Sequence, residues 1–474
     1  MAQLHDLTAL DQWQELQKGT FSPLDLTDHY LGRIEALNPE LGAFVTVTAD
    51  AARARARQVT TSVPTSAPLW GLASGDKDLW MRAGVHAGFG SRLFADFVPE
   101  TSDEIVQTLD AAGAISLGKT NAPEFGLPSY TESLAAPPAR NPWDPSLGAG
   151  GSSGGAAVAV AAGMLPFAPG SDGGGSIRIP AAACGLVGLK PSRGLIPAGS
   201  GVDSLAGLVV DGPLARTVAD AALLLDGMIS RVHGRIDHHF TLRAPGGDAP
   251  YLGSAVRGEG RYQLGVMTTS AWDDAYEIAI DQQARAALDS AVAEFAALGH
   301  GIEETALESD DTYAPAFRTI WQAGAARIPA DGEAEALLEP LTRWLVRRGR
   351  ALSARELSEA LATLSAYERS FIRQFSTFDA VLTPALAMTP RPIGWYDQED
   401  AEHNFAQQVQ YTPFTSMVNV TGLPAIVLPI HQSPDGLPMG VQLIGRPGGE
   451  ATLLALGAQL ERRVRWQRRH PAGW

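Results

Sequence analysis

Three short glycine-rich segments carry the side chains that could do chemistry. They are Gly71-Leu-Ala-Ser-Gly-Asp-Lys77-Asp78, Gly150-Gly-Ser152-Ser-Gly154 and Ser171-Asp-Gly-Gly-Gly-Ser176. A serine hydroxyl is a weak nucleophile and needs a base to take its proton. A lysine is a base only when it is neutral, and burial favours the neutral form. Alone, each residue would usually be a solvated lysine or a turn serine; together they indicate covalent catalysis.

The first serine loop also fits a second kind of hydrolase. Gly150-Gly-Ser152-Ser-Gly154 matches the G-x-S-x-G pattern of the α/β-hydrolase nucleophile elbow, which would make Ser152 the nucleophile of an esterase. That elbow needs a hydrophobic strand before it. The preceding segment, ARNPWDPSLGA, contains two prolines, which argue against a central strand. This alternative assigns the nucleophile to a different serine and is therefore kept.

One further match suggests a nucleotide site. Gly113-Ala-Ile-Ser-Leu-Gly118-Lys119-Thr120 satisfies the P-loop pattern. A P-loop follows a strand and opens a helix. Here a helix is predicted before Gly113, residues 114–117 are themselves strand-like, and Pro123 interrupts the chain where the phosphate-binding helix should begin. We therefore expect no nucleotide binding.

The elements expected around these loops alternate between helix and strand. Ser22 can cap a helix that has Pro23 at its first position. The Gly-, Ala- and Pro-rich stretch 241–260 is predicted to be an exposed loop. The alternation predicts an α/β fold with a mixed sheet covered by helices. Further helices are predicted at 102–112, 156–163, 215–227, 281–298 and 354–374, and strands at 114–117, 164–170, 378–382, 425–428 and 440–444.

Charge and hydropathy narrow the range of partners. The 474 residues include 52 acidic and 36 basic ones, and the formal charge of −16 argues against nucleic acid or an anionic membrane surface. No run of about 18 uncharged apolar residues predicts a membrane span. The N-terminal segment lacks the pattern of a signal peptide. Five arginines near the C-terminus are expected to lie at a solvated helix end: Arg462, Arg463, Arg465, Arg468 and Arg469.

The numbers and positions of cysteines and histidines predict no redox or metal chemistry. The single cysteine, Cys184, cannot form a disulfide within the chain, which suits a reducing cytoplasm. The ten histidines are scattered, and His238-His239 is the one adjacent pair. Without an H-E-x-x-H motif or a cysteine cluster, we expect neither a metal nor a cofactor.

Taken together, the three glycine-rich segments resemble the lysine, glycine-serine and nucleophile motifs of the amidase signature family. The separation of the two key serines, 24 residues, also suits that family. The resemblance extends from about residue 20 to about residue 460. Further similar segments are Gly118-Lys-Thr-Asn-Ala-Pro-Glu124-Phe125, Asn141-Pro-Trp143, Cys184-Gly-Leu-Val-Gly-Leu-Lys-Pro191 and Asn419-Val-Thr-Gly-Leu-Pro-Ala425.

The resemblance implies a role for each of the three residues. Ser176 would be the nucleophile that forms an acyl-enzyme, and Ser152 would pass its proton to Lys77. A free lysine has a pKa of about 10.4, so burial would have to lower the pKa of Lys77 before it could accept a proton. The peptide bond that precedes Ser152 is expected to be cis. Asp172 and Arg178 are expected to hold the nucleophile loop without taking part in the chemistry.

The resemblance also implies which residues would contact the substrate. Backbone N–H groups of Gly173, Gly174, Gly175 and Ser176 would form the oxyanion hole. Gly126 would lie at a wall of the acyl pocket. Many relatives have a larger residue at the position of Gly173, so this glycine would add space beside the nucleophile. Other walls are expected from segments 125–140, 310–350 and 390–415, with Phe125, Tyr130, Trp321, Trp395 and Tyr396 as aromatic candidates.

The implied fold is one large α/β domain over residues 1–474, with a large mixed sheet covered by helices on both faces. Its catalytic core would comprise about residues 70–200 and 375–460, with a helical, variable pocket region at about 280–375. The implied reaction is hydrolysis of a small-molecule amide. The sequence Asp-Gly-Gly-Gly-Ser-Ile-Arg is similar to that of a branch of the family that acts on cyclic or oligomeric amides, aryl amides and carbamates. The resemblance therefore implies aryl acylamidase, esterase or urethanase activity.

Two other functions stay open at this point. The glutamine-hydrolysing component of a tRNA-dependent amidotransferase has the same motifs but works inside a complex. An α/β-hydrolase-like esterase would use Ser152 as its nucleophile. A homodimer is also left open.

Overall fold

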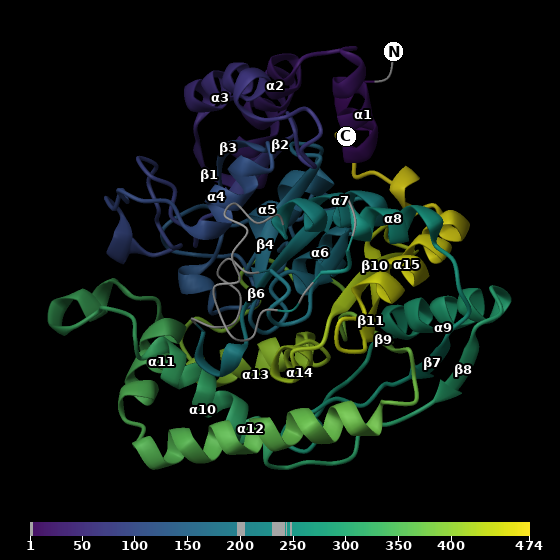
Figure 1. Ribbon diagram of the computed structural model, residues 1–474. Helices are drawn as coiled ribbons and strands as arrows, with labels where there is room; N and C mark the ends of the chain where they lie inside the picture. Colours follow the sequence, from purple (N-terminus) through teal and green to yellow (C-terminus); the bar gives the residue numbers. More distant parts are fainter. Residues whose placement is uncertain (1–2, 197–203, 230–241, 243, 247–248) are drawn as a thin grey trace.

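An eight-stranded sheet forms the centre of the molecule (Figure 1). A computed structural model describes residues 3–196, 204–229, 242, 244–246 and 249–474. The strand order is β4-β6-β5-β10-β11-β9-β7-β8; neighbours from β4 to β9 are antiparallel, whereas β9-β7 and β7-β8 are parallel. The strands are β4 (Phe167–Asp172), β5 (Val187–Lys190), β6 (Val210–Ala215), β7 (Gln263–Val266), β8 (Gly301–Glu304), β9 (Ala380–Pro384), β10 (Ala425–Gln432) and β11 (Pro438–Gly445).

A smaller sheet has the strand order β1-β3-β2, with strands β1 (Phe44–Val47), β2 (Ala73–Lys77) and β3 (Ile115–Thr120). The predicted strand at 114–117 is part of β3. β2 was not predicted, because Gly and Asp, and to a lesser degree Ala and Lys, are depleted in strands. All five of its residues are nevertheless buried. β2 ends at Lys77, whose Nζ reaches Ser171 of β4, so the two sheets meet at this residue.

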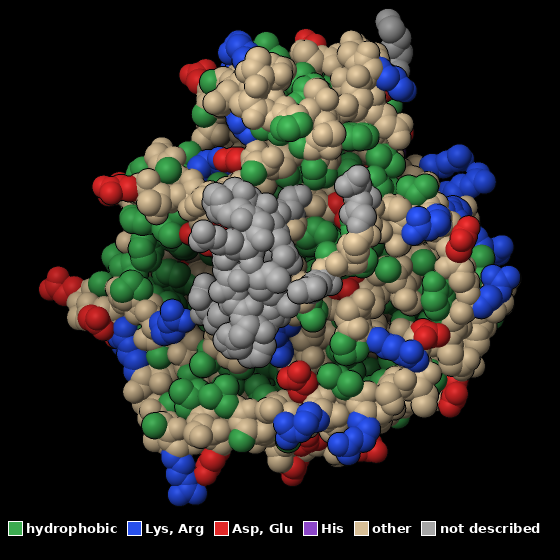
Figure 2. Space-filling model, in the orientation of Figure 1, with side chains coloured by type: hydrophobic (Ala, Val, Ile, Leu, Met, Phe, Trp, Pro, Cys, Tyr) green, Lys and Arg blue, Asp and Glu red, His purple; other side chains and the backbone are tan. Residues whose placement is uncertain are grey.

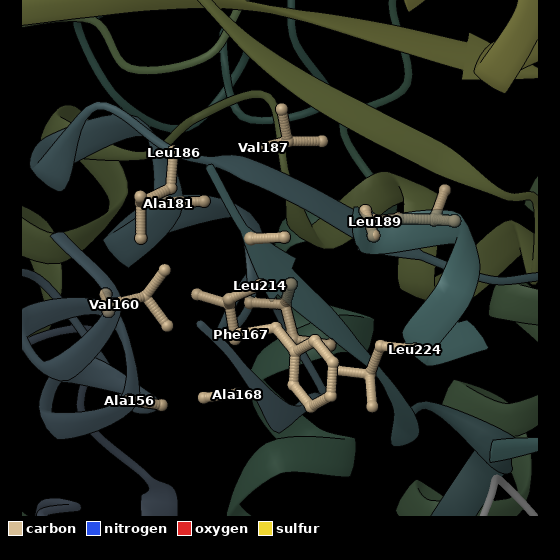
Figure 3. Packing of buried hydrophobic residues seen from close by; sticks show 14 of the residues in the cluster. Ala156, Val160, Phe167, Ala168, Ala181, Leu186, Val187, Leu189, Leu214 and Leu224 are labelled. Carbon is tan, nitrogen blue, oxygen red and sulfur yellow. The ribbon is translucent and has the colours of Figure 1, made fainter. Parts of the chain in front are cut away.

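Helices cover both faces of the large sheet, as expected. Phe167 and Ala168 are consecutive in β4, and consecutive strand residues point to opposite faces. Figure 3 shows Ala168 beside Ala156 of α5 (Gly154–Ala161) and Phe167 beside Leu224 of α7 (Val218–Met228). These two helices therefore lie on opposite faces of β4. The other helices packed against this sheet are α6 (Arg178–Cys184), α9 (Gln282–Ala297) and α15 (Glu450–Val464).

Two groups of helices lie outside this layer. The first lies beside the small sheet, at the top of Figure 1. In this group, α2 (Pro23–Leu41) is capped by Ser22, whose hydroxyl accepts from Asp25 N, and Pro23 is its first residue, as predicted. The second lies at the bottom of that view; four of its helices contribute to one hydrophobic cluster, and residues 340–350 contribute to another. The first group is α1 (Ala9–Lys18), α2 (Pro23–Leu41) and α3 (Ala49–Ser62), with α4 (Glu104–Ala111) nearby; the second is α10 (Tyr313–Ala325), α11 (Pro340–Arg350), α12 (Ala354–Gln374), α13 (Ala401–Tyr411) and α14 (Ser416–Thr421).

The prediction of an exposed loop at 241–260 is wrong for its second half. Pro250–Arg257 form the helix α8, which buries Tyr251. The first N–H groups of α8 donate to the carboxylate of Asp226 in α7, at 3.1 Å from Tyr251 N and 2.9 Å from Leu252 N. The capping side chain lies in another helix, so the local sequence does not show it, although Pro250 at the first position and Gly258 after the last turn are local helix signals.

The P-loop match does not have the strand–loop–helix arrangement of a P-loop. Its residues from Ile115 onward form β3, and α4 precedes them. Lys119 is fully buried, donates to the carbonyl of Trp80 and lies 3.6 Å from a carboxylate oxygen of Asp78. The lysine therefore has protein partners in place of phosphate.

Charged side chains of both signs are interspersed around the face of the molecule in Figure 2. At the end of α15, Arg463 pairs with Glu294 at 2.5 Å, and Arg462 donates to the carbonyls of Val256 and Arg257. These arginines of the C-terminal run contact neighbouring elements. Within the described ranges, no helix combines the length and the apolar character needed to cross a membrane.

The close packing of α5 gives a stability prediction. A Cβ at Gly155 would overlap the backbone N of Asn121 and the carbonyl O of Ala43, whereas a Cβ at the exposed helical Gly32 would meet nothing within 4 Å. We expect Gly155→Ala to lower the free energy of unfolding by about 1–3 kcal/mol through overpacking. Gly32→Ala should raise it by about 0.4–1 kcal/mol by restricting the unfolded chain. Urea denaturation measures both; equal effects would show that α5 can move away.

Candidate active site

Lys77 lies at the centre of the site. Its amine is fully buried and donates to the Ser152 hydroxyl at 2.9 Å, to the Ser171 hydroxyl at 2.9 Å and to the Ser171 carbonyl at 3.2 Å. Burial lowers the pKa of Lys77 to about 7, against the opposing charges of Asp211 and Asp172. Near neutral pH the amine is therefore poised between its two forms. A neutral amine has one lone pair, so it can accept a proton from Ser152 while it still donates to Ser171.

The loop that carries Ser152 approaches the backbone of another segment closely. The Gly151–Ser152 peptide bond is cis, as the resemblance implied. A Cβ at Gly151 would lie 2.7 Å from the carbonyl carbon of Tyr130, so only glycine fits there. α5 begins two residues after Ser152. Over the described residues 139–149 no strand forms, only isolated bridges, so the strand that a nucleophile elbow requires does not precede Ser152.

Ser176 lies at the end of the loop that connects β4 to α6. Its carbonyl accepts from Ser153 N at 3.0 Å, which ties the two serine loops together. The hydroxyls of Ser152 and Ser176 line the same cavity. In the part of the chain that the structure describes, these two hydroxyls make no hydrogen bond with each other. Among the side chains of Ser176, Ser152 and Lys77, the hydrogen bond present is therefore the one between Ser152 and Lys77.

The glycines before Ser176 divide into two kinds. The N–H of Gly175 donates to Asp172 Oδ1 at 2.7 Å. Gly175 has φ 134°, and a Cβ there would lie 2.5 Å from Thr415 Oγ1. The N–H groups of Gly173, Gly174 and Ser176 make no hydrogen bond within the described residues. Of the four N–H groups expected to form an oxyanion hole, the amide of Gly175 is already bonded to Asp172. The other three remain as candidate donors.

A buried ion pair holds the nucleophile loop, as predicted. Asp172 and Arg178 are both fully buried, with Oδ1 2.9 Å from Nη2 and Oδ2 2.9 Å from Nε. Although burial would raise it, the pKa of Asp172 is held well below its usual range by the Arg178 guanidinium. Arg178 also donates to Asn419 Oδ1 and Gln442 Oε1, each at 2.7 Å. The pair therefore ties the loop to α14 and β11.

A cavity of about 350 Å³ opens beside the two serines. Gly126 and Gly173 both line it. A Cβ at Gly126 would lie 2.6 Å from Leu79 Cδ1 and 3.2 Å from Ser152 Oγ, and φ there is 68°. Any side chain at this position would therefore press on the serine as well as on the cavity. The other lining residues are Leu79, Trp80, Phe125, Leu127, Ser171, Ser204, Leu205, Leu208, Val209, Asp211, Ile320, Trp321, Gly324 and Arg327.

A second cavity, of about 60 Å³, shares Ser176, Leu127 and Trp321 with the first. Most of its wall is apolar and aromatic, from α10, α13 and the residues around Trp272. Ser176 thus lies in the wall between two hollows, where one half of a molecule can occupy each. The remaining lining residues are Pro128, Ser129, Gly174, Ile179, Trp272, Phe317, Phe405, Gln408, Val409, Thr412 and Ser416.

The aromatic candidates divide between the cavity and the core. Phe125 and Trp321 line the larger cavity. Tyr130 and Tyr396 are buried and stack on each other, with ring centroids 4.0 Å apart, and Trp395 packs edge-on against Tyr396. These three side chains therefore pack within the core.

Sequence reasoning missed two polar residues of the site. Ser171 hydrogen-bonds Lys77, and Asp211 of β6 lines the larger cavity. A signal existed for Ser171, since it immediately precedes Asp172 of the nucleophile motif. Asp211 lies in register with Ser171 through strand pairing, which the sequence does not reveal. Across the described ranges no group of three His, Cys, Asp or Glu is arranged to hold a metal; His238-His239 falls outside those ranges.

Comparisons with known proteins agree with this geometry. The family model described as Amidase matches residues 25–454. The chain is 38% identical over 470 residues to "Putative amidase AmiB2" of Mycobacterium tuberculosis, covering 98% of this chain and 97% of that protein. It is 32% identical over 495 residues to 6-aminohexanoate-cyclic-dimer hydrolase of Paenarthrobacter ureafaciens, with 98% of each covered. A solved structure of 6-aminohexanoate cyclic dimer hydrolase, complexed with substrate, superposes with a TM-score of 0.89 at 31% identity and 99% coverage of both chains.

The buried ion pair gives a second stability prediction. Arg178→Met leaves the Asp172 carboxylate buried without its partner, so we expect the free energy of unfolding to fall by about 3–5 kcal/mol. The double variant Arg178→Met/Asp172→Asn removes that uncompensated charge and should recover part of the loss. Arg355→Ala, which breaks the exposed pair with Glu359, is the matched control and should change little. Losses of the same size for Arg178→Met and Arg355→Ala in urea denaturation would contradict this role of the buried pair.

Proposed function

The chain belongs to the amidase family and is an amide-hydrolysing enzyme, and on that premise we propose that Ser176 attacks the amide carbonyl, with Ser152 and Lys77 as its proton relay. One observation above all supports this: the buried Lys77 amine is hydrogen-bonded to Ser152 at 2.9 Å, beside the cavity that Ser176 also lines. Burial that lowers the pKa of Lys77 to about 7 provides the neutral amine that a base requires.

In the first step, Ser176 Oγ forms a bond to the carbonyl carbon. The Ser176 proton passes to Ser152, whose own proton passes to Lys77, so that the lysine gains one positive charge. The carbonyl oxygen becomes an oxyanion. The N–H groups of Gly173, Gly174 and Ser176 are the donors proposed to stabilise it, and such donors act strongly because they are already oriented before the reaction.

In the second step, the C–N bond breaks and the acyl group remains on Ser176. Lys77 returns its proton through Ser152 to the departing nitrogen, because an amide anion is too basic to leave unprotonated. The amine then departs, and water attacks the acyl-enzyme with the same relay as its base. The acid is released and Ser176 recovers its proton. Both halves of the reaction need Lys77 to change its protonation state once in each direction.

The two cavities favour a substrate with a substituent on each side of the cleaved bond. Their walls are largely apolar, with Trp321 between them and Phe125 and Trp272 on either side. We therefore propose substituted amides, among them aryl, cyclic and carbamate compounds, as substrates. The cyclic amide that gives the cyclic dimer hydrolase its name fits this class. With Cys184 as its single cysteine, we place the enzyme in the cytoplasm.

The alternative as a component of an amidotransferase makes a different biochemical demand. A protein of that kind would need the other members of its complex, whereas the proposed enzyme hydrolyses amides as a single purified chain. A panel of primary, aryl, cyclic and carbamate substrates, tested on the purified chain, separates the two.

The first functional prediction concerns the nucleophile. We expect a fluorophosphonate probe to form its adduct on Ser176, as found by peptide mapping with mass spectrometry. Ser176→Ala should abolish labelling, and Ser153→Ala, which changes the neighbouring hydroxyl of the other loop, should not. An adduct on Ser152 would instead support the esterase alternative.

The second functional prediction concerns Lys77. For an amide, Lys77→Ala removes both the base and the acid that protonates the leaving nitrogen; for a matched nitrophenyl ester it chiefly removes the base. Because each proton transfer contributes about 10²–10⁴-fold, we expect kcat/KM to fall far more for the amide than for the ester. Since the protonated amine cannot act as a base, wild-type activity should also decline below about pH 7.

The control for this experiment is the fold of the variant. Circular dichroism and the midpoint of thermal unfolding should show that Lys77→Ala keeps the native fold. We expect this because the substitution removes a buried amine and adds no new polar group. If the folded variant lost both activities in equal proportion, the acid role would belong to another group.

A further inference from the structure

One buried carboxyl group faces the larger cavity without a partner among the described residues. Asp211 lies in β6 opposite Ser171 of β4, is 2% exposed, and lines the cavity together with Ser152 and Ser176. Within the described ranges its carboxyl group makes no hydrogen bond and no ion pair. Because this carboxyl group faces the cavity, a ligand that enters the cavity can form the hydrogen bonds that the described residues do not provide.

The chemistry of this group follows from its burial. Burial raises the pKa of Asp211 to about 8, against the opposing charge of Lys77 and with a smaller contribution from Asp103 in the same direction. Near neutral pH the side chain is therefore a carboxylic acid. Such an acid has one O–H donor and a carbonyl acceptor side by side. It is complementary to any group that presents an acceptor and a donor with the same spacing.

The charged neighbours of Asp211 do not supply that partner. Asp172 is bonded to Arg178, and Lys77 donates to Ser152 and Ser171. The carboxylates of β2 and of the residue that follows it are likewise paired with cations. A protonated Asp211 carries no charge with which to attract an ammonium group, so a neutral ligand is favoured. The remaining pairs are Asp76 with Arg82 and Asp78 with Lys119.

We propose that Asp211 determines specificity by binding a second amide group of the substrate, beyond the amide that is cleaved. A primary amide presents its C=O acceptor and one N–H donor on the same edge, so one such group satisfies both atoms of the acid. The apolar walls around Asp211, from Leu208, Val209 and Ile320, suit the hydrocarbon that would link the two amides. The inference rests on the proposed function, because the cleaved amide is taken to lie at Ser176.

The test compares two substrates that differ in one group. The first is a linear diamide whose second amide is a terminal primary amide; the second is a monoamide of the same length, in which methylenes replace that amide. Asp211→Leu removes both hydrogen-bonding atoms and Asp211→Asn keeps a donor and an acceptor. We expect Asp211→Leu to lower kcat/KM for the diamide by roughly 10- to 100-fold, mainly through KM, from the loss of two hydrogen bonds. The monoamide should change less than about twofold, because it makes neither bond.

The pH dependence distinguishes binding from a structural role. In the wild type, KM for the diamide should rise above about pH 8 as Asp211 loses its proton and with it the O–H donor. Asp211→Asn should bind the diamide near neutral pH and show no such rise. KM for the monoamide should stay level in both proteins. A residue that merely supported the fold would leave these pH profiles unchanged.

The control variant is Asp220→Asn, which alters a buried carboxyl group of α7 that does not line the cavity. It should change the unfolding midpoint without changing the ratio of diamide to monoamide activity. Equal losses on both substrates in Asp211→Leu would overturn the inference. Failure of Ser176 to take the fluorophosphonate would instead refute the proposed relay.

Discussion

Burial of a single amine organises this structure. Lys77 is the last residue of β2, and its Nζ crosses to β4 and to the loop before α5. A lysine without water around it must find acceptors in the protein, and here they are two hydroxyls and one carbonyl. This need fixes where the small sheet meets the large one. It also orients the Ser152 hydroxyl, whose loop is held against β4 by a further hydrogen bond from the Ser153 hydroxyl to the Ser171 carbonyl.

The loops around that amine are held by close approaches that side chains would prevent. Gly151 lies against the backbone of Tyr130, and Gly175 lies against Thr415. The Asp172–Arg178 pair then ties the second loop to α14 and β11 through Asn419 and other polar groups. Parts of the chain that are more than two hundred residues apart thus determine the position of one serine. Close packing of the backbone holds the two loops in place, and the Asp172–Arg178 pair orients the second loop.

How far the sequence predicts this arrangement depends on whether the signal is local. Ser22-Pro23 predicts the start of α2 because the capping residue and the first turn are adjacent in the chain. The lysine and serine motifs were likewise found because each is a short run of unusual residues. By contrast, β2 contains residues that are depleted in strands, and it is a strand because β3 pairs with it. α8 depends on Asp226 for its capping, and Asp211 reaches the cavity only through the register of β6 on β4. The bonding of the Gly175 amide to Asp172 is also a matter of three-dimensional geometry that composition does not contain.

The position of Gly126 determines which wall of the cavity evolution can alter. At φ 68° and within reach of Ser152, residue 126 cannot acquire a side chain without disturbing the relay. Another wall is formed by α10, where Gly324 has open space around it and Ile320 and Trp321 also line the cavity. Substitutions there change the shape of the hollow while β2, β4 and the serine loops stay in place. New substrate preferences in this lineage, whether natural or selected in the laboratory, should therefore accumulate along one face of one helix.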